Sequence, residues 1–475
     1  MRAAMACRRP NVSAGLLLCC SWMWACNEQV ATPDIPVKLS ERRAVKSSVW
    51  PSQDFNLTWL TWQEGLDVAK EEGKPLLYYI AAPGCDGLFK NPSLLVRALI
   101  EKSFVSVRIH PFVHPDWVAR LSVAGCPALI NALPDGRVFA RAVDIPPNNV
   151  EQYLLRMHSV FKKERKRLLT KVNQEAKVVF TRYSTTELQQ YLMASFDWKE
   201  KGLFGPQKFL HATALRFLWQ TGNPDAIAFV EETVEVLIAS PLWEDGSFRL
   251  FSYSPDWNHP APERDLLDQA EIIGLLIEME RWELIEKWVS YINKSIADST
   301  TGALYGRQLL RVDGEWWTDP NVYVDRMASL LVRLIEIFER TNSALAYKLA
   351  SEGIEYILNE CVDGSGGVRH VCNRDGAFRL PTDQALVALA LSAWSSQSDN
   401  SSLGQLANQV IQTGIEKSQM DLDELGLVFA AFWYWNYGEK SRAEQMISAA
   451  HYDPEQIRQA ALWGLLDLRL DQLKR

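Results

Sequence analysis

The chain of 475 residues is long enough for about two or three domains, and its composition, 47% hydrophobic and 23% charged, is that of an ordinary globular protein. A net charge of −8 argues against a nucleic-acid partner, because binding to phosphates needs a basic face. The 18 tryptophan residues suit either large cores or the wall of a sugar-binding barrel, and the core is the favoured interpretation. The sequence predicts neither a cofactor nor a metal site.

The N-terminus has the pattern of an export signal. Two arginines precede an apolar run, residues 15–25, that is too short to cross a bilayer as a helix. The run ends at Cys26 in a sequence that resembles a bacterial lipobox, although an ordinary secretory signal is the alternative. We therefore predict a lipoprotein-type signal over 1–26, a polar tether over 27–52, and attachment to a membrane through lipid on Cys26. We therefore expect the protein to be located in a bacterial cell envelope, on the periplasmic or exterior side.

Residues 53–158 have the pattern of an α/β domain. An amphipathic helix precedes a buried apolar strand, which ends in a turn that holds Cys85. A second helix and a second strand follow, Cys126 stands at the start of a third strand, and a Pro-Asp-Gly turn precedes a fourth. One basic helix is predicted over 150–171, and we place the linker to the next domain at 159–183.

The remainder of the chain, residues 184–475, reads as about twelve helices that come in pairs. Such pairs bury their apolar stripes only by stacking into a closed ring or a solenoid. Similar polar residues recur 57, 57 and 58 residues apart, each in the first turns of the first helix of a pair: His211, Asp268, Asp325 and Asp383. We interpret this register as six hairpins, with the first helix of each pair in an inner ring.

Three long connections, residues 241–262, 298–320 and 361–381, each precede an inner helix. They should therefore gather at one end of the ring, where a ligand pocket is expected. The residues predicted to line this pocket are His211, Trp257, Glu263, Asp268, Trp316, Trp317, Asp319, Asp325 and Asp383.

Several motifs in order resemble one known family. They are the strand that ends at Cys85 and residues 202–209, 251–257, 263–270 and 380–385. Together they are similar to thioredoxin-domain proteins with a large C-terminal α/α barrel, the family related to spermatogenesis-associated protein 20. The resemblance implies a multi-domain fold, α/β plus all-α. It consists of a thioredoxin-like domain, with a cis peptide bond before Pro127, followed by a six-hairpin (α/α)6 barrel related to sugar 2-epimerases.

Two departures from the family pattern bear on activity. The family turn reads Cys-His-Trp-Cys-His, whereas this chain has Leu88 in place of the second cysteine. A dithiol oxidoreductase needs that second thiol to resolve the mixed disulfide. The family motif Pro-His-Phe-Glu-Lys is here Pro-Ala-Pro-Glu-Arg at 260–264, so its histidine is missing. We therefore predict a binding or accessory protein, with a saccharide or a protein as its ligand.

Two enzymatic alternatives stay open at the level of sequence. An epimerase or isomerase usually needs two facing bases, and only His211 among the histidines lies in the inner-ring register. Glu263 and Asp268 are the carboxylates available for glycosidase-like catalysis. The second alternative is an atypical thiol redox protein that uses Cys85 and Cys126.

Four cysteines remain after the signal and Cys26, and an even number outside the cytoplasm favours disulfides. A glycine-rich segment lets the chain turn back between Cys361 and Cys372, which predicts one bridge. In thioredoxin folds the residue before the cis-proline lies against the active-site turn. The resemblance therefore implies that Cys126 neighbours Cys85.

Overall fold

The structure is a computed structural model that describes residues 57–121, 123, 125–174, 184–372, 379–398, 400–413, 424–438, 440–449, 461–466 and 468. The predicted signal, Cys26 and the predicted tether lie outside the described residues. No helix in the described part of the chain is both long and apolar enough to span a bilayer.

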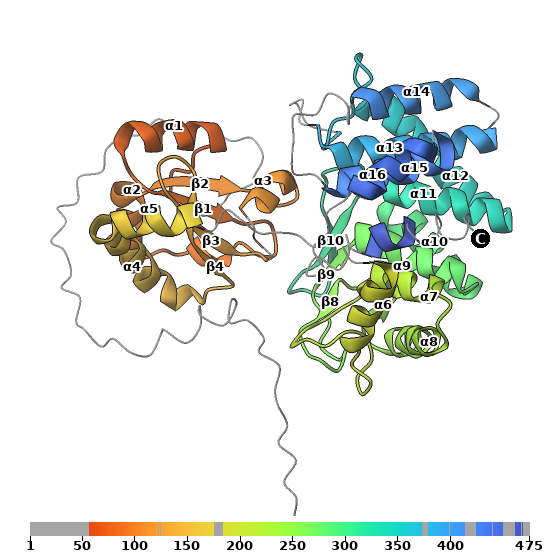
Figure 1. Cartoon of the computed structure of the whole chain (residues 1–475), viewed down its shortest axis with the longest axis horizontal. Coiled ribbons are helices and arrows are strands. Elements are labelled where there is room, and N and C mark those ends of the chain that lie inside the picture. The colour runs from red at the N-terminus through yellow and green to blue at the C-terminus, as the bar shows by residue number, and fades with distance from the viewer. Residues whose placement is uncertain are drawn as a thin grey trace, which may run out of the picture. The chain divides into compact units, whose positions relative to one another are not determined.

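The N-terminal part contains a four-stranded mixed sheet of order β2-β1-β3-β4 (Figure 1). Its strands are β1 (Leu76–Ile80), β2 (Val105–Ile109), β3 (Ala128–Ala132) and β4 (Val138–Val143). β1 pairs parallel with β2 and antiparallel with β3, and β3 pairs antiparallel with β4. All five residues of β1 are buried, as expected for a central strand.

Alternate residues of β1 enter two separate cores. Leu77 and Tyr79 pack with α2 (Leu94–Ser103) and α4 (Val150–Lys163) on one face. Tyr78 and the residues two positions before and after it pack with α1 (Trp62–Glu72) and α3 (Pro115–Arg120) on the other face. This arrangement follows from the period of two in a strand, which sends successive side chains to opposite faces.

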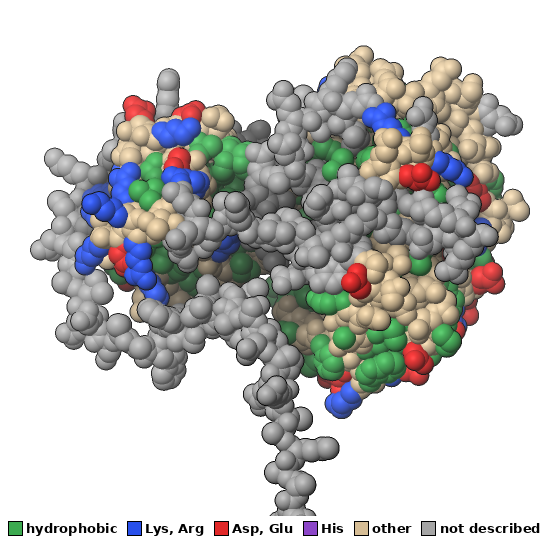
Figure 2. All heavy atoms as spheres, in the orientation of Figure 1, with side chains coloured by type: hydrophobic (Ala, Val, Ile, Leu, Met, Phe, Trp, Pro, Cys, Tyr) green, Lys and Arg blue, Asp and Glu red, His purple; other side chains and the backbone are tan. Residues whose placement is uncertain are grey.

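The prediction of one continuous helix over 150–171 is wrong. The helix is interrupted at Glu164, which has non-helical backbone angles and separates α4 from α5 (Arg165–Gln174). α4 buries Leu154, Met157 and Phe161 at helical spacing, whereas the start of α5 is exposed and basic. Lys and Arg side chains gather on the surface over these two helices (Figure 2).

The C-terminal part is a ring of paired helices. Five inner helices contact one another in sequence order: α7 (Ala212–Gln220), α9 (Leu266–Glu278), α11 (Val324–Thr341), α13 (Pro381–Ser398) and α15 (Glu424–Tyr437). Each packs against the outer helix that follows it: α8 (Pro224–Ala239), α10 (Trp282–Tyr291), α12 (Ala344–Tyr356), α14 (Ser401–Ile411) and α16 (Lys440–Ala449). Helical residues 461–466 place Gly464 against Phe217 of α7 and Leu188 of α6 (Thr185–Ala194), which adds the sixth pair. The described helices thus form the predicted (α/α)6 barrel.

Three inner helices begin later than predicted, because the residues before them form strands. Before α7, β5 (Lys208–Phe209) pairs with β8 (Phe251–Ser252). Before α9, β9 (Glu263–Asp265) joins β10 (Arg307–Leu310) and β11 (Trp316–Thr318) in one sheet. An isolated bridge from Tyr323 to Val371 precedes α11. These pairings bring the three long connections together at one end of the ring, as predicted.

The predicted Cys361–Cys372 disulfide is present, and Cys85 and Cys126, which were expected to be neighbours, are also bonded. Cys85 and Cys126 are bonded with their Cα atoms 5.7 Å apart, and the Cys126–Pro127 peptide bond is cis. Cys361 and Cys372 are bonded with their Cα atoms 4.5 Å apart. Cys361 and Cys372 are buried, whereas Cys85 and Cys126 are only half-buried.

The Cys361–Cys372 bridge should contribute to stability because it closes a loop of 11 residues in the unfolded chain. A Cys361→Ala/Cys372→Ala double variant should lose about 2–3 kcal/mol of unfolding free energy, measured by denaturant titration. An unchanged unfolding midpoint for the double variant would contradict the structural role of this bridge.

Candidate functional site in the helical barrel

The larger cavity lies inside the ring of inner helices and has a volume of about 310 Å3. Its wall comes from α7, α9, α11, α13 and α15 and from Leu462. Exposed residues in the last turns of α11 and α15, among them Arg340 and Tyr437, mark its mouth. The cavity therefore opens at the C-terminal ends of the inner helices, away from the long connections.

Charged side chains on inner faces of the ring are held in pairs. Arg216 of α7 donates through Nε to Glu278 Oε1 of α9 at 2.6 Å, and its Nη2 lies 2.5 Å from the same oxygen. Arg333 of α11 forms an ion pair with Glu336 one turn later. Both arginines are mostly shielded from solvent, and paired burial of this kind fixes side chains that would otherwise be mobile. The cavity thus has a rigid polar wall beside its apolar residues.

The close approach of α9 to Arg333 depends on a glycine. A Cβ atom added to Gly274 would lie 3.1 Å from Cζ of the Arg333 guanidinium. Glycine at this position therefore leaves room for the guanidinium on the inner face of α9. Any larger residue would push Arg333 towards the cavity.

Two carboxyl groups on α11 have pKa values shifted in opposite directions. Burial raises the pKa of Glu339, and the nearby charge of Glu336 adds to the effect. Burial by itself opposes ionisation of Glu336 as well, but the charges of Arg333 and Arg216 outweigh it and lower the pKa of Glu336. Glu336 is thus held ionised, while Glu339 accepts a proton more readily than an ordinary glutamate.

A smaller pocket of about 140 Å3 lies at the N-terminal ends of α7 and α9. His211 and Asp268 line it, so the structure brings together two of the residues singled out in the sequence. His211 is the N-cap of α7 and has φ 43°, a left-handed conformation that is unusual for a residue with a side chain. Burial, with a smaller effect of Lys208, lowers the pKa of His211 to about 4. Its imidazole is therefore neutral at pH 7.

Thr213 and Glu271 line both the pocket and the cavity. The Thr213 hydroxyl donates a hydrogen bond to Glu271 Oε2, which joins α7 to α9 at this point. One side-chain pair therefore separates the two spaces. A small rotation of either side chain would change the opening between them.

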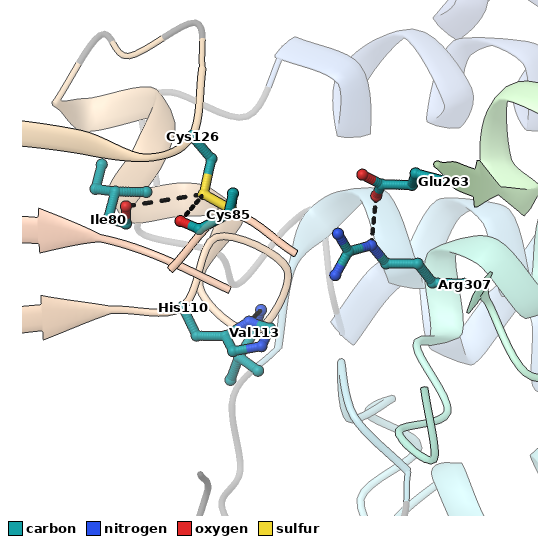
Figure 3. Close-up of a disulfide and its surroundings, with 7 residues drawn as sticks. All are labelled: Ile80, Cys85, His110, Val113, Cys126, Glu263 and Arg307. Atoms are coloured by element: carbon teal, nitrogen blue, oxygen red, sulfur yellow. Dashed lines mark hydrogen bonds and ion pairs between the residues drawn. A yellow bond between two sulfur atoms is a disulfide. The ribbon is translucent and has the colours of Figure 1, made fainter. Parts of the chain in front are cut away.

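The pocket expected at the loop end is smaller than predicted, because of the nine predicted residues only His211 and Asp268 line it. Phe112, from the segment after β2, occupies this region, with its ring 4.1 Å from the Arg307 guanidinium and 5.2 Å from that of Arg326. Arg307 also forms an ion pair with Glu263, which lines neither the cavity nor the smaller pocket (Figure 3). Contacts between an aromatic ring and guanidinium groups are favourable, so Phe112 is held in this region.

The other predicted lining residues have structural contacts. Trp257 is buried, and its indole nitrogen donates to the Glu200 carbonyl oxygen at 2.7 Å. The Trp316 ring lies 3.9 Å from the Arg264 guanidinium, and Trp317 is half-buried in β11. Asp319 accepts a hydrogen bond from the Tyr323 hydroxyl at 3.0 Å. None of these is placed to reach a ligand in the cavity.

Asp325 and Asp383 meet at His370, a residue that the sequence analysis did not use. Ligand atoms of the three side chains lie within 4.8 Å of one another, so a metal ion has to be considered. His370 Nδ1, however, lies 2.9 Å from Asp383 Oδ2, and Nε2 lies 2.8 Å from the Phe112 carbonyl oxygen. A carbonyl oxygen can only accept, so Nε2 carries a proton, and Arg326 forms an ion pair with Asp325 at 2.7 Å. We interpret the cluster as a buried imidazolium held between the Asp383 carboxylate and the Phe112 carbonyl, with the Asp325 carboxylate nearby.

The His370 cluster should make stability depend on pH. Burial alone would lower the pKa of His370, but Asp383, Asp325 and the Phe112 carbonyl outweigh it and raise the pKa to about 9. The folded state thus keeps a proton that the unfolded chain loses near pH 6.5. The stabilisation is complete below pH 6.5 and disappears as pH rises through about 9, a loss of about 3 kcal/mol. His114 also faces His370, and its pKa is lowered by burial and by that charge.

Urea unfolding between pH 6.5 and 9 measures this dependence. His370→Gln should flatten the decline, whereas His259→Gln, a control at an exposed histidine, should leave it unchanged. Equal slopes for the wild type and His370→Gln would contradict the interpretation. A loss of stability in EDTA that zinc restores would make the cluster a metal site instead.

The charged cavity residues Arg216, Glu271, Arg333, Glu336 and Glu339 were missed in the sequence analysis. One signal was available: Arg333 and Glu336 are three residues apart on a helix whose buried positions are mostly apolar. The register had marked only the first turns of the inner helices. The charges lie further along the same helices.

No protein-family model matches the sequence, and no curated protein matches it. Among solved structures, the chain is similar to a D-mannose isomerase, with a TM-score of 0.46, 12% identity, and coverage of 60% of this chain and 97% of that one. It is similar to a family 76 glycoside hydrolase (mannosidase) from Bacteroides thetaiotaomicron, with a TM-score of 0.45, 11% identity, and coverage of 61% and 98%. It is also similar to cellobiose 2-epimerase from Spirochaeta thermophila, with a TM-score of 0.44, 11% identity, and coverage of 60% and 94%. Likenesses this weak assign no activity to this chain.

Proposed function

We propose that the helical barrel binds a saccharide in its interior cavity. The observation that carries the proposal is a cavity of about 310 Å3 whose wall combines fixed guanidinium and carboxylate groups with the rings of Phe432 and Tyr437. A space of this size suits a small ligand. Carboxylates accept hydrogen bonds from hydroxyl groups, guanidinium groups donate to them, and the apolar face of a sugar ring packs on an aromatic ring.

The geometry favours binding over epimerisation. Epimerisation removes a proton from one face of a carbon atom and returns it to the other, which usually needs two bases. No histidine occurs among the described residues that line the cavity, and His211 reaches only the smaller pocket. Glu336 and Glu339 both line the cavity and have pKa values shifted in opposite directions, so they are the candidate pair for the enzymatic alternative, glycoside hydrolysis.

Glu339 offers a test with little structural cost, because it is exposed at the mouth of the cavity. Glu339→Gln keeps the oxygen that accepts from Gln397 but removes the charge. The dissociation constant of any saccharide bound by the wild type should rise by about tenfold or more, as expected when a hydrogen bond to a charged group is lost. Isothermal titration calorimetry against a panel of mono- and disaccharides measures it.

The matched control is Glu286→Gln, a change of the same kind on the outer face of α10. The control should bind like the wild type. A wild-type protein that binds no saccharide of the panel would overturn the proposed function. Release of reducing sugar by the wild type, lost in Glu339→Gln, would establish the hydrolytic variant.

A second candidate function is thiol exchange at the Cys85–Cys126 bridge. The sheet order, the helices on both faces and the cis bond before Pro127 support the thioredoxin-like fold that the resemblance implied. The bridge is half-buried, unlike the buried Cys361–Cys372 pair. Disulfides that are accessible are the ones that exchange with external thiols.

The surroundings of the bridge distinguish its two sulfur atoms. Cys126 Sγ lies 3.6 Å from the Cys85 carbonyl oxygen and 3.8 Å from that of Ile80 (Figure 3). These oxygens disfavour a thiolate on Cys126, so Cys85 is the better leaving group. An external dithiol attacks Cys126 and displaces Cys85 as a thiolate. The second donor thiol then releases Cys126, and the donor leaves as a disulfide.

Limited reduction with dithiothreitol followed by alkylation tests this assignment. Mass spectrometry should find label on Cys85 before Cys126, with Cys361 and Cys372 still bonded. A Cys85→Ser variant should form a mixed disulfide through Cys126. Simultaneous opening of both bridges, or equal labelling of Cys85 and Cys126, would remove the redox function.

A further inference from the structure

An aromatic surface adjoins the smaller pocket. Phe209 of β5 lies opposite Phe251 of β8, and their rings stack with centroids 5.0 Å apart. Tyr253 continues the row, with its ring 4.9 Å from that of Phe251. Phe209 is 41% exposed and Tyr253 is 54% exposed, so both ends of the row are accessible to solvent. We call Phe209, Phe251 and Tyr253 the aromatic row.

Polar groups flank the aromatic row. The Ser254 hydroxyl lies 2.9 Å from Nδ1 of His259, which is exposed, and also donates to Asp256. Hydroxyl, imidazole and carboxylate groups beside exposed rings form a surface suited to sugar units. Sugar units present C–H faces to aromatic rings and hydroxyl groups to polar side chains.

The aromatic row is continuous with the interior of the barrel. Phe209 itself lines the smaller pocket, and that pocket shares Thr213 and Glu271 with the larger cavity. The cavity then follows α11 from Ser329 to Arg340, roughly 16 Å at the rise of an α-helix. A path of this length is longer than one sugar ring.

We propose that the ligand of the barrel is an oligosaccharide chain, with the aromatic row as an outer subsite next to the His211 pocket. This inference rests on the proposed function, since it names the class of saccharide for the same barrel. One end of the chain lies on the Phe209 and Tyr253 rings, and the other end reaches the Thr213–Glu271 pair. His211 is neutral, so it hydrogen-bonds a hydroxyl group without the cost of burying a charge.

Calorimetry with the full chain tests the inference, using linear gluco- and manno-oligosaccharides from mono- to tetrasaccharide. Affinity should increase from mono- to trisaccharide. Tyr253→Ala should weaken trisaccharide binding by roughly threefold to tenfold, the range for loss of one aromatic contact, and leave monosaccharide binding unchanged. Tyr253→Phe, which keeps the ring, should retain most of the affinity for the trisaccharide.

Tyr347→Ala is the matched control, because Tyr347 is 42% exposed on the outer helix α12. It should bind every oligosaccharide like the wild type. Equal affinity for all chain lengths, or an equal loss for mono- and trisaccharide in Tyr253→Ala, would overturn the outer subsite and leave the cavity proposal intact. Absence of binding at any length would overturn both.

Discussion

The Phe112 ring lies 4.1 Å from the Arg307 guanidinium and 5.2 Å from that of Arg326, where it occupies space at the loop end of the barrel. Its carbonyl oxygen is tied to His370, and His370 is tied to Asp383, so both the ring and the backbone of this residue are fixed. The loop end, where sequence reasoning expected the pocket, is therefore filled except beside His211. The larger space is displaced to the C-terminal ends of the inner helices.

Two charged networks in the barrel differ in whether their side chains can contact a ligand. Around His370, donors and acceptors satisfy one another in a buried cluster, and such a network stabilises one arrangement without offering a group to a ligand. Along the cavity, Arg216 and Arg333 hold Glu278 and Glu336, while the exposed Glu339 carries a raised pKa. Carboxylate groups next to aromatic rings are suited to a neutral ligand rich in hydroxyl groups.

The sequence predicted the architecture better than the site. Period-two and period-3.6 patterns located the sheet strands and the paired helices. The spacing of His211 and Asp268 correctly brought them to one pocket. Asp325 and Asp383 occupy equivalent positions but are buried. They lie beside His370, which is hydrogen-bonded to the Phe112 carbonyl, a group far away in the sequence. Phe112 looks like an ordinary loop residue, and no local pattern indicates where its ring will lie.

The central claim is that the interior cavity, and not the space that Phe112 occupies, receives the ligand. A crystal structure of the full chain grown with a bound saccharide tests this most directly. The account predicts electron density for a sugar ring between α11 and α15, within hydrogen-bonding distance of Glu336 or Glu339, with Phe112 still beside Arg307 and Arg326. A sugar bound in place of Phe112, or a cavity closed by apolar side chains, would contradict it.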